Sequence, residues 1–307
     1  MNTQSSTIRE PFEAQRVAPV SLSATRPFFW SVKRELWENR STYIAPLVAA
    51  AVFLFGFLIN MLAMRRGVHA MWPFDPAQQH RLLTTRYELA GAMIMGTALI
   101  VGIFYSLDAL YGERRDRSIL FWKSLPVSDV TAVLSKVTIP LVILPLLSFA
   151  ITIATQWMML LLSSVILLGS GVNIATLWRD ASFVHVPLVL LYHLITVHGL
   201  WYAPMYGWLL LISAWAPRAP FLWAALPPFV IYGVEKIAFN TSYFLGLLQN
   251  RLTGPQDAMA PDGMPKDFMA TLIPHHFFSE PGLWIGLGVA ALFLAGAVRL
   301  RRYQGPI

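Results

Sequence analysis

The 307-residue sequence contains no cysteine, and only 13% of its residues are charged. Without cysteine, neither a disulfide bond nor a metal site with thiolate ligands can form. An ordinary soluble domain carries about 25% charged residues, whereas 56% of this chain is hydrophobic. A soluble core cannot bury so much apolar surface, so the composition indicates a protein that crosses a lipid bilayer.

Several motifs of catalysis are also absent from the sequence. The P-loop pattern G-x-x-x-x-G-K-[ST], which cradles nucleotide phosphates, does not occur, and neither does the G-x-S-x-G pattern of a serine nucleophile. The basic residues cluster between apolar runs and do not form the patch that binds nucleic acid. We therefore predict that the chain is not an enzyme, with no catalytic residue, no resident metal and no nucleic-acid partner.

Six apolar runs are long enough to cross a bilayer, which takes roughly 17–25 helical residues. We expect the spans at residues 44–64, 89–107, 137–168, 186–214, 220–239 and 283–300. The third run exceeds one hydrocarbon thickness, so it must tilt, kink at Pro140 or Pro145, or project from the membrane. Residues 215–219 join the fourth and fifth runs, which indicates a tight hairpin turn. The expected fold class is all-α: a polytopic membrane protein with about six transmembrane helices.

Lysine and arginine are distributed unevenly between alternate loops. With the N-terminus in the cytoplasm, the inner segments hold 15 of these residues and the outer loops hold 7. Because cytoplasmic loops are enriched in basic residues, we expect a multi-pass protein of the cell inner (plasma) membrane with both termini cytoplasmic. The first 20 residues lack the apolar stretch of a cleavable signal peptide. We predict a disordered cytoplasmic tail at residues 1–26 and a single transmembrane domain at residues 44–303.

Residues 27–43 precede the first span and have an amphipathic pattern. Phe29, Val32 and Leu36 fall at helical spacing, and charged residues occupy the other positions of the helical wheel. This pattern predicts a helix that lies on the inner membrane surface. It is either a plain juxtamembrane anchor or an elbow helix that also contacts a cytoplasmic partner.

The inner loop between the second and third spans, residues 108–136, combines charges with aromatic side chains. A dense run of charged residues is followed by an apolar cluster around Phe121 and Trp122. A merely solvated loop does not need such a cluster, so it must be buried against the spans or against a partner. Ser128 or Asp129 can cap the helix that leads into the third span.

Two stretches of the chain resemble bacterial ABC-2 type transporter permeases. Residues 106–129 (SLDALYGERRDRSILFWKSLPVSD) resemble the loop between the second and third spans of these permeases. Residues 200–220 (LWYAPMYGWLLLISAWAPRAP) resemble their fourth-to-fifth hairpin. The order of elements is also similar, with an amphipathic lead-in, six spans and a long last outer loop.

The resemblance implies partners and a role for the inner loop. Such permeases pair as dimers, here with a second copy or a paralogue, and dock separate ABC ATP-binding subunits that bind ATP and Mg²⁺. The chain itself would then hold no cofactor. The loop after the second span acts as a coupling helix that sits in a groove of the ATPase. Carried over by position, the ATPase-coupling residues are Tyr111, Glu113, Arg114, Arg115, Asp116, Arg117, Phe121 and Trp122.

A few polar residues lie within the expected spans, where ionisable groups are costly and often functional. We consider four of them either as structural groups or as a candidate transport path at a dimer interface: Gln156, His193, His198 and Glu235. His193 and His198 are five residues apart, which on an α-helix places them on different faces. We therefore expect them to be a poor pair of metal ligands.

The sequence favours the membrane-spanning permease subunit of an ATP-driven ABC exporter, surrounded by membrane lipid. It would move an unidentified substrate across or out of the inner membrane with ATP hydrolysed by the separate subunit. Two alternatives stay open. An ATP-independent secondary transporter predicts inverted repeats, which we do not find. A membrane lipid-modifying enzyme needs a convergent acid/base or metal site.

Overall fold

The computed structural model describes residues 25–66, 76–125, 127–166, 168, 185–253 and 277–307. Within this part of the chain every regular element is a helix, which confirms the all-α fold class. Five helical segments are long and apolar enough to cross a membrane: Ser41–Ala63, Thr85–Arg115, Asp129–Ile166, Pro220–Phe239 and Pro281–Tyr303. Nearly all of the predicted tail at residues 1–26 lies outside the described residues.

The expected fourth span is helical but divided into three elements. These are α9 (His185–His193), the π-helix η3 (Leu194–Trp201) and α10 (Ala203–Trp215), and none of them alone has the length of a span. The backbone N–H of Tyr202 donates to the carbonyl of Val197, five residues earlier, at 3.0 Å. Pro204 follows shortly after this wide turn. A proline clashes with the carbonyl four residues before it, which disfavours regular α-helical winding there. The expected count of six thus becomes five segments and one divided helix.

The expected third span is part of a longer helical segment. α6 (Asp129–Thr138), the π-helix η2 (Ile139–Ile143) and α7 (Leu144–Ile166) follow one another without a break over 38 residues. At about 1.5 Å per residue the segment is roughly 57 Å long, almost twice the thickness of a bilayer core. The irregular turn contains Pro140, one of the two positions where a kink was expected. α6 therefore extends beyond the apolar part and reaches the charged end of the molecule.

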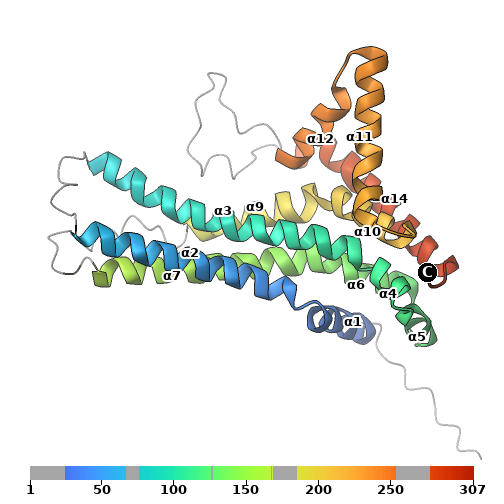
Figure 1. Ribbon diagram of the computed structural model, residues 1–307, viewed down its shortest axis with the longest axis horizontal. Coiled ribbons are helices and arrows are strands. Elements are labelled where there is room, and N and C mark those ends of the chain that lie inside the picture. Colours follow the sequence, from blue (N-terminus) through green and yellow to red (C-terminus); the bar gives the residue numbers. More distant parts are fainter. Residues whose placement is uncertain (1–24, 67–75, 126, 167, 169–184, 254–276) are drawn as a thin grey trace, which may run out of the picture.

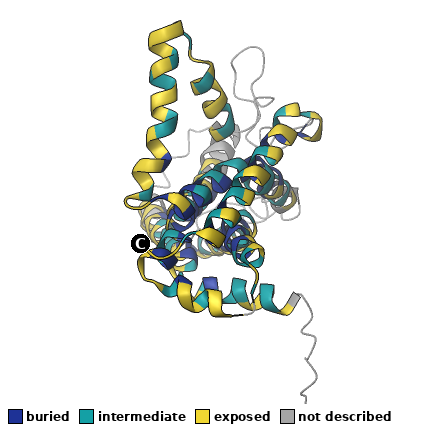
Figure 2. Cartoon of the chain, turned by 90° about the vertical axis from the view of Figure 1, so that its right-hand side faces the viewer, coloured by how far each residue is buried: buried dark blue, intermediate teal, exposed yellow. Residues whose placement is uncertain are grey.

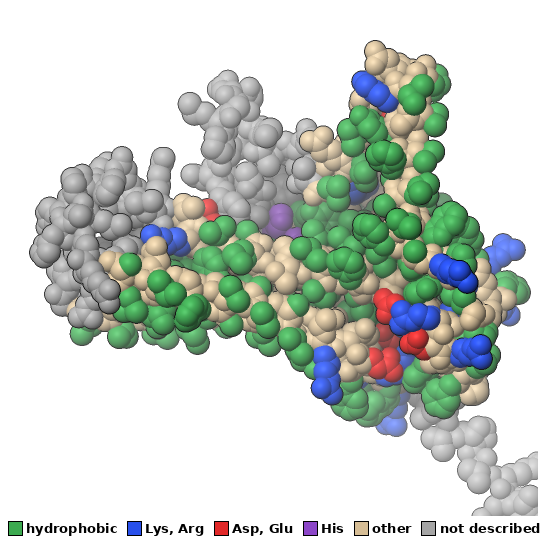
Figure 3. All heavy atoms as spheres, in the orientation of Figure 1, with side chains coloured by type: hydrophobic (Ala, Val, Ile, Leu, Met, Phe, Trp, Pro, Cys, Tyr) green, Lys and Arg blue, Asp and Glu red, His purple; other side chains and the backbone are tan. Residues whose placement is uncertain are grey.

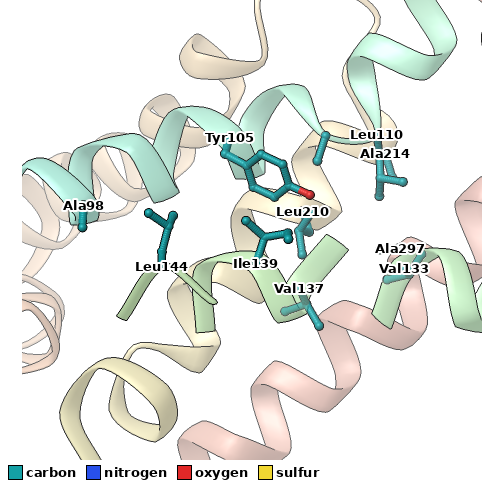
Figure 4. Packing of buried hydrophobic residues seen from close by; sticks show 11 residues of the cluster. Ala98, Tyr105, Leu110, Val133, Val137, Ile139, Leu144, Leu210, Ala214 and Ala297 are labelled. Atoms are coloured by element: carbon teal, nitrogen blue, oxygen red, sulfur yellow. The ribbon is translucent and has the colours of Figure 1, made fainter. Parts of the chain in front are cut away.

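The long helices pack in two groups (Figure 1). α2 (Ser41–Arg66), α3 (Pro76–Asp108) and α7 pack against one another, while α10 packs along α14 (Pro281–Tyr303). α3 also contacts α10 and joins the groups. Figure 4 shows the core where they meet, with Tyr105 of α3, Ile139 of η2 and Leu210 of α10 converging. α1 (Thr25–Glu38) packs against α6 and ends before residue 43, where the amphipathic helix was expected to end.

The fifth apolar helix, α11 (Pro220–Phe239), leaves the bundle. Figure 1 shows it rising away from α10, and Figure 2 shows exposed residues along most of its length. The expected hairpin is therefore wrong in one respect: the turn is tight, but the two helices diverge. Ala219 at the turn has a left-handed backbone (φ 47°). The Trp208 indole N–H of α10 donates to the carbonyl of Ala224 at 3.2 Å and ties the first turns of α11 to α10. α12 (Tyr243–Thr253) follows α11 and returns toward the bundle.

Candidate functional site

The inner loop folds as two short helices, α4 (Tyr111–Arg115) and α5 (Ser118–Ser124). Arg117 between them has a left-handed backbone (φ 58°), which turns the chain sharply after α4. The Ser128 hydroxyl accepts a hydrogen bond from the backbone N–H of Thr131 and caps α6. Of the two residues considered for this cap, Ser128 is the one observed.

α4 is fixed to the end of α10 by hydrogen bonds that its backbone and a side chain donate to α10. The Ser213 hydroxyl accepts from the backbone N–H of Tyr111 at 2.9 Å. The Arg114 guanidinium donates to the carbonyls of Ala214 and Ala216 at 2.6 and 3.2 Å. These bonds satisfy backbone groups that helix ends leave without intrahelical partners. The start of α4 and the end of α10 are therefore held together.

Beside α4, six charged side chains from four elements form one ion-pair network. We call it the charge cluster: Arg34 and Glu35 of α1, Glu113 of α4, Asp129 and Lys136 of α6, and Arg301 of α14. Three of these six groups are acidic and three are basic, so their formal charges cancel. The exposed Glu38 also pairs with Arg34 at 3.5 Å and adds one negative charge at the edge of the cluster. Figure 3 shows acidic and basic side chains gathered at this end of the molecule.

Lys136 and Glu113 form the centre of the charge cluster. The Lys136 ammonium lies 2.8 Å from a Glu35 carboxylate oxygen and 3.2 Å from a Glu113 oxygen. The other Glu113 oxygen lies 3.3 Å from the Arg301 guanidinium, which also pairs with Asp129. Glu35 is 1% exposed and Lys136 is 2% exposed. Buried charges of this kind are tolerated only when they are paired and hydrogen-bonded, so these helices must stay together.

Arg34 connects α1 to both short helices. Its guanidinium lies 2.6 Å from Glu35 and 3.3 Å from Glu113, and it stacks on the Trp122 ring of α5 at 3.7 Å from the ring centre. Burial raises the pKa of the Glu35 carboxyl, but Lys136, Arg34 and a hydrogen bond from Tyr105 together lower that pKa below its ordinary value. Glu35 is therefore held as a carboxylate inside the protein.

The eight predicted coupling residues do not share one environment. Glu113 and Arg114 are buried and bound to this chain, so in this arrangement they do not face a partner. Trp122 is half-buried beneath Arg34, and Tyr111 is half-buried. The remaining four residues are exposed: Arg115, Asp116, Arg117 and Phe121.

The apolar cluster of the inner loop is likewise divided. Ile119 is buried within the chain, whereas Leu120 and Phe121 are each 59% exposed. The Lys123 ammonium donates to the carbonyls of Arg302 and Gln304 at 3.3 and 2.9 Å, which attaches α5 to the end of α14. One side of α5 is therefore built into the protein, and the other side presents apolar surface outward.

Gln156 and Glu235, two of the candidate path residues, lie on separate elements with separate partners. The Gln156 amide donates to the carbonyl of Tyr87 at a long 3.5 Å, between α7 and α3. The Glu235 carboxylate accepts from the backbone N–H groups of Tyr243 and Phe244 at 2.6 and 2.9 Å. Glu235 thereby caps the N-terminus of α12, which gives this carboxylate a structural role.

The two histidines of the divided helix lie close together, contrary to expectation. The ring centres of His193 and His198 are 5.8 Å apart, and Tyr202 follows at 5.2 Å from His198. The expectation of different faces is wrong because it assumed α-helical winding. A π-helix bonds each residue to the fifth one along, which brings positions five apart onto one side. Among the described residues, no group of three or more His, Cys, Asp or Glu side chains could hold a metal ion.

Five residues of the network were not recognised from the sequence as members of a site: Arg34, Glu35, Tyr105, Lys136 and Arg301. Their common signal is a polar or charged side chain within a turn or two of an apolar run. No family model, curated protein or solved structure matches the chain. A functional assignment therefore depends on the geometry of α4, α5 and the charge cluster.

Proposed function

We propose that the chain is the membrane-spanning permease subunit of an ATP-driven ABC exporter in the inner membrane. It works with a separate ATP-binding subunit and with a second permease copy or a paralogue. The observation that carries the proposal is the anchorage of α4 and α5. This pair of short helices has an exposed outer side, and its inner side is fixed to α1, α6, α10 and α14.

Such an element suits the transfer of force between a soluble partner and membrane helices. ATP-driven closure moves the spans only if a rigid part converts the one motion into the other. The exposed side of α5 offers the apolar pair Leu120 and Phe121 to a partner groove. The charged residues Arg115, Asp116 and Arg117 lie exposed on the preceding turn and can orient the partner. ATP and Mg²⁺ would be bound by that partner.

The test is copurification of the chain with the P-loop ATPase expected from a neighbouring reading frame. Replacing Phe121 by Asp places a charge in the proposed apolar contact, so we expect the ATPase to be lost from the purified complex. Phe121→Leu keeps the contact apolar and should retain the ATPase. Phe278→Asp is a matched control, because Phe278 is 56% exposed but lies beside α14's N-terminal end, away from α5.

The outcome is read against the elution profile of each variant in detergent, which shows whether the fold is intact. Retention of the ATPase at the wild-type ratio by a folded Phe121→Asp variant would contradict the assignment of α5 as the docking element. Failure of any P-loop protein to copurify with the wild type would contradict the exporter proposal itself.

A further inference from the structure

A groove between α2 and α3 is polar at one end and apolar along the rest of its length. It has a volume of about 330 Å³, and its apolar walls include Val52 and Phe57 of α2 and Met93 of α3. Two polar residues, Asn60 and Arg86, line the same groove. The lining is therefore mostly apolar with a single cationic group.

The polar residues lie at one end of the groove. α2 and α3 pack side by side and run in opposite directions. Asn60 lies close to the end of the apolar segment Ser41–Ala63, and Arg86 lies at the beginning of the segment Thr85–Arg115. Val52 and Met93 lie seven or eight residues deeper, which is roughly 10–12 Å along a helix. The groove thus passes from a cationic mouth at the membrane surface to an apolar interior.

Gly56 opens the middle of the groove. A β-carbon built at Gly56 would meet no other atom within 4 Å, so the glycine leaves space that the fold does not fill. Any larger side chain at this position would project into open space instead of into packed helices. The groove can therefore be filled by substitution without overpacking the protein.

We infer that this groove binds an anionic phospholipid of the surrounding leaflet, with one acyl chain along α2 and α3 and the phosphate beside Arg86. A guanidinium pairs with phosphate through charge-assisted hydrogen bonds, and Asn60 can donate a further one. The apolar walls match an acyl chain, whose burial is favourable over their length. The inference depends on the chain crossing a membrane and does not depend on the exporter proposal.

The experiment is native mass spectrometry of the delipidated full-length protein with phosphatidylglycerol or phosphatidylcholine of identical acyl chains. We expect the wild type to retain phosphatidylglycerol in preference to phosphatidylcholine. Arg86→Gln should weaken phosphatidylglycerol binding by about tenfold, as expected for loss of a charged hydrogen bond, and Arg86→Lys should restore part of it. Gly56→Leu should reduce binding of both lipids, because its side chain occupies the acyl path.

Gly233→Leu on α11 is the matched control, since a β-carbon there also meets nothing within 4 Å and lies away from the groove. It should bind lipid as the wild type does. Equal binding of the two lipids by the wild type would overturn the inference, and so would unchanged binding by folded Arg86→Gln and Gly56→Leu variants. If Gly56→Leu fails to fold, the Arg86 series alone decides, because it leaves the apolar walls intact.

Discussion

Lys136 is the residue on which the charge cluster depends most. Its ammonium contacts two carboxylates, on α1 and on α4, and it is almost completely buried. Removing one partner of a buried ion pair typically costs about 3–5 kcal/mol, because the remaining charge stays buried without compensation. We expect Lys136→Met to lower the free energy of unfolding by that amount, measured by denaturant titration in mixed detergent micelles.

A matched control for this substitution is Arg299→Met. Arg299 carries the same charge, lies on α14 two residues before Arg301, and is exposed. Exposed substitutions usually change stability by no more than about 0.5 kcal/mol. Equal losses from Lys136→Met and Arg299→Met would show that the cluster contributes through net charge alone and not through its buried pairs.

The acid stability of the protein depends on Glu35. Burial acts to raise the pKa of this carboxyl, yet Lys136, Arg34 and the Tyr105 hydroxyl lower it overall. A lowered pKa in the folded state stabilises the protein above the ordinary value of 4.5, and this stabilisation is lost as the pH falls through the folded value. The wild type should therefore lose its stability advantage over Glu35→Gln below pH 4.5, in thermal unfolding followed at several pH values. Parallel pH profiles of the two proteins would contradict this role.

The two π-helices are local features that the sequence pattern did not predict. Apolar runs predicted the helical stretches well, because their length and composition depend on the chain alone. The local winding at residues 139–143 and 194–201 depends on neighbouring structure, since η2 and η3 pack against each other. A periodicity of 3.6 residues was assumed throughout, and it separated His193 from His198, which the wide turn brings together.

The contact between α10 and α14 depends on the absence of a side chain at Gly207. A β-carbon there would lie 3.3 Å from the carbonyl oxygen of Ala290 and 3.4 Å from the β-carbon of Phe293. Gly207→Val would force the helices apart, and overpacking of this kind costs about 1–3 kcal/mol. We expect that loss in thermal or denaturant unfolding.

Gly288→Val on α14 controls for the effect of a β-branched residue on helix formation, because its side chain would meet nothing within 4 Å. The control should change stability by less than about 1 kcal/mol. If both variants lose the same stability, helix propensity explains the effect and the close approach of the helices does not.

At the scale of the whole molecule, the orientation in the membrane is a prediction that the absence of cysteine makes easy to test. A single cysteine introduced at an exposed position can be labelled specifically, because the chain has no cysteine of its own. We expect Ser242→Cys to react with a membrane-impermeant maleimide in intact cells. Ser124→Cys and Arg218→Cys should react only after permeabilisation. The reversed pattern would contradict the proposed orientation, and identical labelling at all three positions would contradict multiple crossings.

The all-α class and the approximate position of the apolar helices followed from the sequence, because an apolar run of this length inside lipid must satisfy its own backbone hydrogen bonds, as a helix does. The charge cluster did not follow. Glu35, Lys136 and Arg301 are 101 and 165 residues apart in succession along the chain, and only the packing of α1, α6 and α14 brings them together. The sequence also did not predict the direction of α11, which follows the short turn at residues 216–219, where Ala219 has a left-handed backbone.

The neutrality of the charge cluster has a mechanical consequence. The six buried and half-buried ions carry no net formal charge, and the additional carboxylate, Glu38, lies exposed at their edge. The group can therefore be displaced as a block without leaving a lone ion in a medium of low dielectric. Sliding one of its four helices past another separates opposite charges and is opposed strongly. Around α4, sliding of one helix past another is therefore opposed more strongly than movement of the four helices together.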